Sequence, residues 1–292
     1  MKRAFFTNRF LPWLLLAPQL AITAIFFLWP AGQAIWQSFL REDAFGLRSE
    51  FIGLGNYRQL LASSEYHNSF TVTLIFTVSV TLVTMIFALL MAVAVDRLIR
   101  SDKLYTTLLI WPYAIAPAVA GILWWFIFNP SIGILPFVLS QLGIDFNWIY
   151  DPTDAMIFVV IASSWSRISY SFLFFVAGLQ SIPASLREAA AIDGAGPIKR
   201  FFTITLPLLS PTTFFLMVVN LVYAMFETFA VIDATTLGGP AQSTNILVYK
   251  VYQDGFVGQN LGSSAAQSVV LMVIVIVLTV IQFRFIEKKV AY

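Results

Sequence analysis

The sequence contains no cysteine and only one histidine, His67, among its 292 residues. The absence of cysteine excludes disulfide bonds and thiolate metal sites, and a single histidine cannot build a His-rich metal centre. Charged residues make up 11% of the chain and leave a formal net charge of +2, which is too weak to indicate a nucleic-acid partner. The sequence also lacks a Gly-x-x-x-x-Gly-Lys-Ser/Thr phosphate loop, so we do not expect the chain to hydrolyse ATP.

Apolar residues, by contrast, are abundant. They make up 59% of the chain, with 28 Phe and 8 Trp, and the mean hydropathy is +0.83. A soluble domain usually has about 25% charged residues. A soluble protein as apolar as this one would expose large apolar patches, so lipid is the expected solvent. The composition therefore predicts an all-α integral membrane protein.

Six stretches are long and apolar enough to cross a membrane, which requires about 20 mostly apolar residues. They are 12–38, 70–95, 105–128, 155–178, 208–232 and 264–284. The first is too long for the core of a signal peptide and lacks a clear small-x-small cleavage site, so we expect a retained helix. Six such stretches leave no room for a separate soluble domain, and we predict a single transmembrane domain over residues 1–292.

Lysine and arginine are unevenly divided between the two sides that these spans define. One side carries Lys2, Arg3, Arg9, Arg97, Arg100, Lys103, Arg187, Lys199, Arg200, Arg284, Lys288 and Lys289. The other side carries only Arg41, Arg48, Arg58 and Lys250. The positive-inside rule places the first side, with both termini and segment 179–207, in the cytoplasm. We expect Asp96, where the second span ends in the cytoplasm, to be solvated.

Segment 181–207 contains signals for two short helices outside the membrane core. Ser185 and Glu188 have the spacing of a capping box. Gly194 and Gly196 can end this helix in a left-handed conformation, and the proline that follows them can begin a second one. These signals alone are equally compatible with a plain connector between two spans.

The same segment resembles the EAA loop of ABC importer permeases. Glu188-Ala189-Ala190 is followed by Gly194, Ile204 and Leu206-Pro207, and each of these positions matches the loop at its fixed spacing. In that family the loop forms coupling helices, which dock in a cleft of the ATP-binding subunit and transmit its closure to the membrane domain. The resemblance implies that these residues contact an ATPase partner. Gly194 would form the tight turn, where a side chain should obstruct docking.

The resemblance extends along the whole chain. Leu15–Pro18, Phe51–Tyr57, Asn129-Pro130 and Gly238–Pro240 are similar to the carbohydrate-type (maltose-like) permeases. Trp111–Ala118, Ser169–Phe175, Gly194–Phe202 and Ser263–Leu271 are similar to A-type permeases of sn-glycerol-3-phosphate importers. The resemblance implies the type I permease fold, with six transmembrane helices and both termini cytoplasmic. It also implies a non-catalytic subunit of the bacterial inner membrane that translocates sn-glycerol-3-phosphate or a related glycerophosphodiester.

The implied partners follow from the same resemblance. They are a second homologous permease subunit, two ATP-binding subunits, a periplasmic or lipid-anchored substrate-binding protein, and membrane lipid, with no nucleic acid. This chain would bind no cofactor, because ATP and Mg²⁺ are used by the partner ATPase.

Two of the predicted spans carry polar residues, which are costly inside a membrane and are therefore candidates for function. Spacings of three and four residues place such groups on one face of each helix. These groups are Ser163, Arg167 and Tyr170 in the fourth span, and Asn220, Tyr223 and Glu227 in the fifth. We expect the two faces to line a shared cavity at mid-membrane.

The resemblance to the maltose importer makes this site more specific. Counted from Glu188, its substrate-lining positions fall at or near Ser163, Ser166, Arg167, Tyr170, Asn220, Ala224 and Glu227. The maltose site has no arginine at the position of Arg167. A glycerol phosphate carries nearly two negative charges, and the guanidinium fork matches phosphate oxygens. Alternatively, Arg167 pairs permanently with Glu227 and only holds the spans together, or this pair opens when phosphate arrives.

Three other functions stay open at this point. A permease for a neutral sugar or oligosaccharide, of the same family, would leave Arg167 structural. Inverted repeats and broken helices would favour an ion-coupled secondary transporter; the sequence shows no internal repeat, and the EAA loop argues against this class. A non-transporting scaffold is disfavoured by charged residues at mid-membrane.

Overall fold

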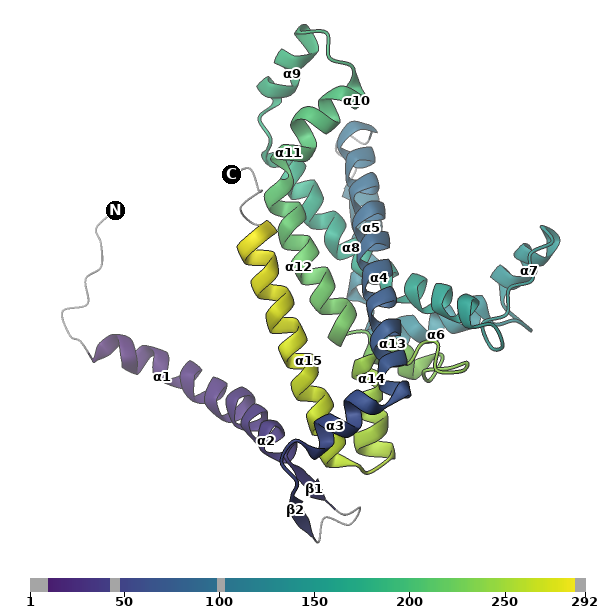
Figure 1. The fold of residues 1–292 in the computed structure, drawn as a ribbon. Helices are drawn as coiled ribbons and strands as arrows, with labels where there is room; N and C mark the ends of the chain where they lie inside the picture. Colours follow the sequence, from purple (N-terminus) through teal and green to yellow (C-terminus); the bar gives the residue numbers. More distant parts are fainter. Residues whose placement is uncertain (1–9, 43–47, 99–102, 287–292) are drawn as a thin grey trace. The chain divides into compact units, whose positions relative to one another are not determined.

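The computed structural model describes residues 10–42, 48–98 and 103–286, and within them the chain is mostly helical (Figure 1). It forms two compact units. The first comprises residues up to 63 together with 251–272, and the second comprises 64–250 together with the residues from 273 onward.

The first unit begins with a continuous apolar helix, Leu11–Gln37, which consists of α1 (Leu11–Thr23), the π-helical η1 (Ala24–Leu28) and α2 (Trp29–Gln37). None of these three segments contains a buried residue. A helix that is apolar on all sides and has no buried face is suited to lipid or to another membrane helix.

A small hairpin follows this helix. Strand β1 (Leu40–Glu42) pairs antiparallel with β2 (Ser49–Phe51), and α3 (Gly55–Ala62) comes next. The buried amide of Asn56 donates hydrogen bonds to the carbonyl oxygens of Ser38 and Leu40, at 2.9 and 2.8 Å. These bonds fix the start of α3 against the hairpin.

The second unit contains most of the remaining helices, and the boundary between the units falls within α14 and α15. In order, the elements are α4 (Ser64–Leu98), α5 (Lys103–Ile110), η2 (Trp111–Ala114), α6 (Pro117–Phe128), α7 (Ile134–Gln141), α8 (Pro152–Ser181), α9 (Ala184–Ile192), α10 (Pro197–Arg200), η3 (Phe201–Thr205), α11 (Leu206–Leu208), α12 (Ser210–Phe226), α13 (Phe229–Ala234), α14 (Leu247–Tyr252), η4 (Gln253–Val257), α15 (Leu261–Ile281) and η5 (Gln282–Ile286).

Within the described residues, four helices are long and apolar enough to cross a membrane. They are Leu11–Gln37, Ser64–Asp96, Pro152–Ser181 and Leu261–Arg284. They correspond to the predicted spans 12–38, 70–95, 155–178 and 264–284, which are confirmed as apolar helices. The total rises to six when each of two bent helix pairs is counted as one span.

The first of the two bent pairs corrects the predicted span 105–128, which is not one continuous helix, whereas the second bends at Leu209, where the predicted span 208–232 begins. Thr107–Ala114 and Pro117–Phe128 meet at 106°, and Pro197–Leu208 and Ser210–Phe226 meet at 67°. At the first bend Ala116 is extended because it precedes a proline, which also lacks the N–H group that a continuous helix requires. The predicted span 208–232 is interrupted near its end, since α12 stops at Phe226 and α13 begins at Phe229.

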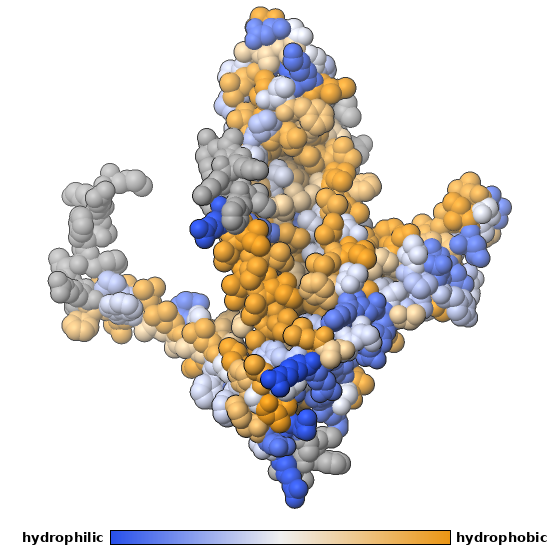
Figure 2. Space-filling model, viewed as in Figure 1, coloured by the Kyte–Doolittle hydropathy of each residue, from blue (hydrophilic) through white to orange (hydrophobic). Residues whose placement is uncertain are grey.

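The core of the second unit lies between α4, α8 and the segment around α12. Small residues of α4, Ala88 and Ala92, are buried with Phe172 and Phe175 of α8 and with Leu216 of α12. Apolar side chains also cover outer surfaces, as Figure 2 shows over α1 and α15. An apolar exterior around a packed core is expected for helices whose outer faces contact lipid.

Candidate substrate site and coupling loop

The segment after α8 forms the predicted helix, glycine turn and second helix, which lie at one end of α8 and α12 (Figure 1). Gly194 has φ +78°, a left-handed conformation that favours glycine. Gly196 is extended instead, with φ −63° and ψ 164°. The predicted capping box is wrong: α9 begins after Pro183 and has no side-chain cap hydrogen bond.

Most of the residues that match the EAA loop are exposed. Glu188, Ala189, Gly194 and Pro207 are exposed, whereas Ala190, Ile204 and Leu206 are half-buried. A Cβ atom added to Gly194 would meet no atom within 4 Å. Two apolar side chains of the same segment are widely exposed, Ile192 at 87% and Ile198 at 75%. An exposed surface of small and apolar residues is typical of a protein interface.

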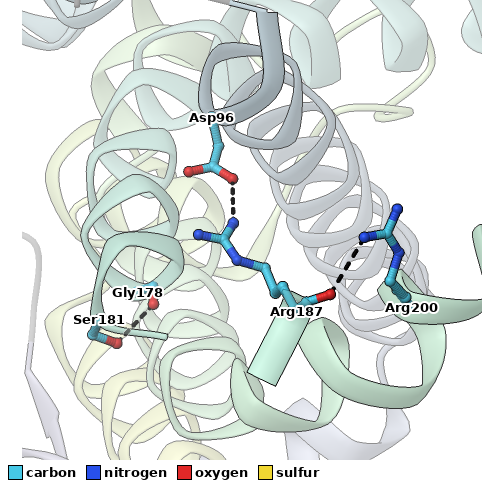
Figure 3. A network of polar contacts seen from close by, with 5 residues as sticks. All are labelled: Asp96, Gly178, Ser181, Arg187 and Arg200. Carbon is cyan, nitrogen blue, oxygen red and sulfur yellow. Dashed lines mark hydrogen bonds and ion pairs between the residues drawn. The ribbon is translucent and has the colours of Figure 1, made fainter. Parts of the chain in front are cut away.

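A polar network joins the base of this loop to α4 (Figure 3). Arg187 donates from Nη1 to Oδ2 of Asp96 at 2.9 Å, and its carbonyl oxygen accepts from Nη1 of Arg200 at 3.3 Å. The expectation that Asp96 is solvated is wrong, because its side chain is 20% exposed and paired. The two partners are 91 residues apart in the sequence, so no local pattern could reveal the pair.

The centre of the polar site is Arg167 of α8, which is 7% exposed. Its Nε donates to Oδ1 of Asn220 at 3.0 Å, and its Nη2 approaches the carbonyl oxygen of Val219 at 3.5 Å. The guanidinium carbon lies 4.2 Å from the ring centroid of Tyr170 and 4.6 Å from that of Tyr223. The two rings therefore contact the cation through cation–π interactions.

The neighbours of Arg167 are themselves held in place. Asn220 is fully buried, and its amide donates to Oγ of Ser171 at 3.0 Å. The hydroxyl of Tyr223 donates to the carbonyl oxygen of Ser163 at 2.9 Å. The structure thus brings together Ser163, Arg167, Tyr170, Asn220 and Tyr223 from α8 and α12, as the helical spacing predicted for these two faces.

The other predicted residues take different positions. Ser166 is half-buried on α8, and Ala224 is fully buried on α12. Glu227 is exposed at the carboxyl-terminal cap of α12. Among the described residues, the ion pairs join Arg187 to Asp96 and Lys250 to Glu65, and none joins Arg167 to Glu227.

Two residues near Arg167 were not foreseen from the sequence. Ser171 accepts a hydrogen bond from the Asn220 amide. It lies one helical turn beyond Arg167, but several other serines of α8 carry the same hydroxyl group, so the sequence did not distinguish it from them. Tyr113 of η2 lies with its ring centroid 5.3 Å from that of Tyr170. No local pattern pointed to Tyr113, because the helix break beside it was not predicted from the sequence.

A family model described as "Binding-protein-dependent transport system inner membrane component" matches residues 84–292, which include α8, the loop and α12. The chain belongs to this family. It is therefore a component of a membrane transport system and a multi-pass membrane protein.

Relatives of this permease match it from end to end. The sn-glycerol-3-phosphate transport system permease protein UgpA of Agrobacterium fabrum is 59% identical over 292 residues, covering all of both chains. The protein of the same name from Brucella abortus is also 59% identical over the full length of both. That from Pectobacterium atrosepticum is 57% identical over 99% of this chain and 98% of its own.

Solved structures of ABC transporters share the fold of this permease. A bacterial ABC transporter involved in the import of the acidic polysaccharide alginate aligns with a TM-score of 0.76 and 22% identity, covering 94% of this chain and 96% of that one. The alginate transporter in complex with its alginate pentasaccharide-bound periplasmic protein gives 0.77 and 21% identity, over 94% and 92%. The fold is thus that of ABC importer permeases.

Proposed function

We propose that this permease is the membrane-spanning subunit of an ATP-driven ABC importer that carries sn-glycerol-3-phosphate, or a related glycerophosphodiester, across the inner membrane. The observation that carries the proposal is the 57–59% identity, over the whole chain, to permeases named for that substrate. The energy comes from partner subunits, and this chain catalyses no reaction and binds no cofactor.

Arg167 is the group suited to an anionic substrate. Two tyrosine rings contact the guanidinium, while Nε and Nη2 face Asn220 and Val219. Its Nη1 group donates no hydrogen bond to the described residues. A buried guanidinium in a membrane helix is costly unless its donors are used. Phosphate oxygens would use the Nη1 edge when the site opens, and would compensate this cost.

The remaining predicted residues take supporting roles in the same pathway. Ser163, Ser166 and Ala224 flank the Arg167 group on α8 and α12, and Glu227 stands at the end of α12 where substrate would pass. An exposed carboxylate there would repel a phosphate, so that Arg167 and not the end of α12 would hold the substrate.

The finer architecture is also part of the proposal. Each bent helix pair counts as one span, so the chain has six spans in one permease domain, with both termini cytoplasmic. The uneven division of lysine and arginine supports this orientation. Six of the cytoplasmic charges, Lys2, Arg3, Arg9, Arg100, Lys288 and Lys289, lie outside the described residues.

The partners follow from the exposed loop. Residues Glu188, Ala189, Ala190, Gly194, Ile204, Leu206 and Pro207 would face one of two ATP-binding subunits. A second homologous permease subunit completes the pathway, and a periplasmic or lipid-anchored binding protein delivers the substrate. ATP-driven closure of the ATP-binding subunits would switch the cavity from inward- to outward-facing.

The test uses the assembled complex in proteoliposomes and a panel of phosphorylated and neutral polyols and sugars. We expect ATP-dependent uptake of sn-glycerol-3-phosphate, competition by glycerophosphodiesters and no competition by neutral sugars. Arg167→Ala should abolish uptake while the complex still assembles, whereas Arg58→Ala, an exposed arginine of α3, should leave uptake unchanged. Uptake of neutral sugars by the wild type would instead assign a sugar permease. Normal uptake, or failed assembly, of Arg167→Ala would refute the role of Arg167.

A further inference from the structure

The coupling loop has few anchors on the helices beneath it. Helix α9 contains no buried residue, and neither does α10. The polypeptide enters the loop at Ile182, which is 6% exposed, and leaves it at Thr205 and Leu209, which are 8% and 1% exposed. Between these points, something other than apolar packing must set the direction of α9.

Arg187 supplies two anchors to the first turns of α9. Its side chain reaches back to Asp96 near the end of α4, at 2.9 Å, and its carbonyl oxygen accepts from Arg200 of α10, at 3.3 Å (Figure 3). One residue thus connects the first loop helix to both the second loop helix and α4. Arg187 directly precedes Glu188 but is not one of the residues that match the EAA loop.

Helix α4 links this anchor to the core of the second unit. Ala88 and Ala92 of α4 belong to the same buried cluster as Leu179 of α8 and Leu209, at the bend before α12. A displacement of α9 that pulls on Asp96 would therefore act on a helix packed against both α8 and the start of α12. Arg167 and Asn220 lie on α8 and α12.

The space beneath the loop allows the ion pair to open. A cavity of about 420 Å³ is lined by Val93, Asp96, Leu179, Arg187, Pro197, Arg200, Phe201 and Thr205. The side chains of Arg187 and Asp96 are 36% and 20% exposed. Partly exposed pairs change an equilibrium by only about two- to fivefold, so this one can break and reform within a transport cycle.

We infer that Arg187 and Asp96 form a latch that positions the first coupling helix against α4, so that movement of the ATP-binding subunits is passed to the transmembrane helices. Both are positioning residues: neither needs to touch substrate or ATP. The inference rests on the proposed function, because it requires that the loop receives an ATP-driven movement.

The test separates coupling from assembly by measuring ATP hydrolysis and substrate uptake on the same proteoliposomes. Asp96→Asn and Arg187→Gln should retain ATP hydrolysis but take up about two- to fivefold less substrate for each ATP hydrolysed. The charge-reversed pair, Asp96→Arg with Arg187→Asp, should restore the ratio. Ser181→Ala is the matched control, because among the described residues its hydroxyl donates to the carbonyl oxygen of Gly178 in its own helix, at 2.7 Å, and to no other helix.

The outcomes distinguish the latch from the proposed function. A wild-type complex that takes up no substrate of the panel with ATP refutes the proposed function. If the wild-type complex takes up substrate with ATP and the single variants keep its ratio of uptake to ATP hydrolysis, the latch alone is overturned. The latch is likewise overturned if the charge-reversed pair assembles but its uptake per ATP stays as low as that of the single variants. A low ratio in Ser181→Ala would mean that any change at this base disturbs coupling, which also overturns it.

Discussion

The exchange of Asn220 for aspartate separates a phosphate-binding role of Arg167 from a structural one. Asn220 is fully buried, and its Oδ1 accepts the Nε–H of Arg167 at 3.0 Å. Aspartate has nearly the same shape and keeps this acceptor, so the hydrogen bond is preserved. It also adds a negative charge beside the guanidinium, where an anionic substrate would bind.

The expected magnitude follows from Coulomb's law. With an effective dielectric constant of about 20, a carboxylate about 6 Å from a bound phosphate repels each unit of its negative charge by about 3 kcal/mol. About 3 kcal/mol corresponds to a rise in the KM of about 100-fold for a phosphodiester with one negative charge, and sn-glycerol-3-phosphate, with nearly two charges, should show a larger rise. Pairing with Arg167 offsets the cost of burying the new carboxylate, and thermal unfolding measures the cost that remains.

The assay is uptake by the reconstituted complex as a function of substrate concentration, with thermal unfolding measured on the same preparation. Asn220→Ala is the comparison: it deprives Arg167 and Ser171 of their partner and should cost about 1–3 kcal/mol of stability. If Arg167 serves only to hold the helices, Asn220→Asp should transport with an unchanged KM. That result would refute the reasoning.

Three further predictions concern the backbone and one helix cap. Gly194→Ala should cost about 1 kcal/mol of stability in unfolding, because Gly194 has a φ of +78°. It should weaken binding of the ATP-binding subunit in co-purification much more, since the added Cβ would lie on the exposed face. Gly196→Ala should change neither stability nor binding. Gly178→Val should destabilise the protein by about 1–3 kcal/mol in thermal unfolding, because a Cβ atom at this position already lies 2.9 Å from side-chain atoms of the segment that packs against it. Val in place of the exposed Ala177 should leave stability unchanged. The backbone N–H groups of residues 154 and 153 lower the pKa of Asp151 below 3.8, so the stability that Asp151 contributes is present at neutral pH and is lost as the pH falls through the lowered pKa. Asp151→Asn should remove this part of the pH dependence of stability, measured by unfolding across acidic pH. A variant with the same acid profile as the wild type would contradict the prediction.

Local signals predicted much of the secondary structure. The continuous helices at 11–37, 64–96, 152–181 and 261–284 follow from hydropathy, since the cost of placing a segment in lipid depends on that segment alone. The turn at Gly194 follows from the backbone freedom of glycine. The break after Ala114 was missed, although it lies near prolines, because prolines are also tolerated within membrane helices, whereas the bend at Leu209 lies where the fifth span was predicted to begin.

Part of the candidate site was also predicted from local signals. Helical periodicity placed Arg167 with Tyr170, and Asn220 with Tyr223, and it holds as long as the helix continues. Glu227 caps α12 with helical backbone angles and donates its N–H to the carbonyl oxygen of Tyr223 at 2.8 Å, so it still follows this face, but the residue is exposed. The sequence left open whether Arg167 pairs with Glu227. Among the described residues it does not, and the arginine donates a hydrogen bond to Asn220 instead.

By itself, then, the sequence determined which segments form long apolar helices and where the chain turns at Gly194, because hydropathy and turn formation depend on neighbouring residues. The function was predicted from the resemblance to ABC importer permeases and not from these local signals. The tertiary structure alone decided which polar groups meet. Arg167 finds Asn220 across 53 positions, and Arg187 finds Asp96 across 91. Such pairs depend on how α4, α8, the loop and α12 pack and bend, and no spacing along the chain specifies that packing.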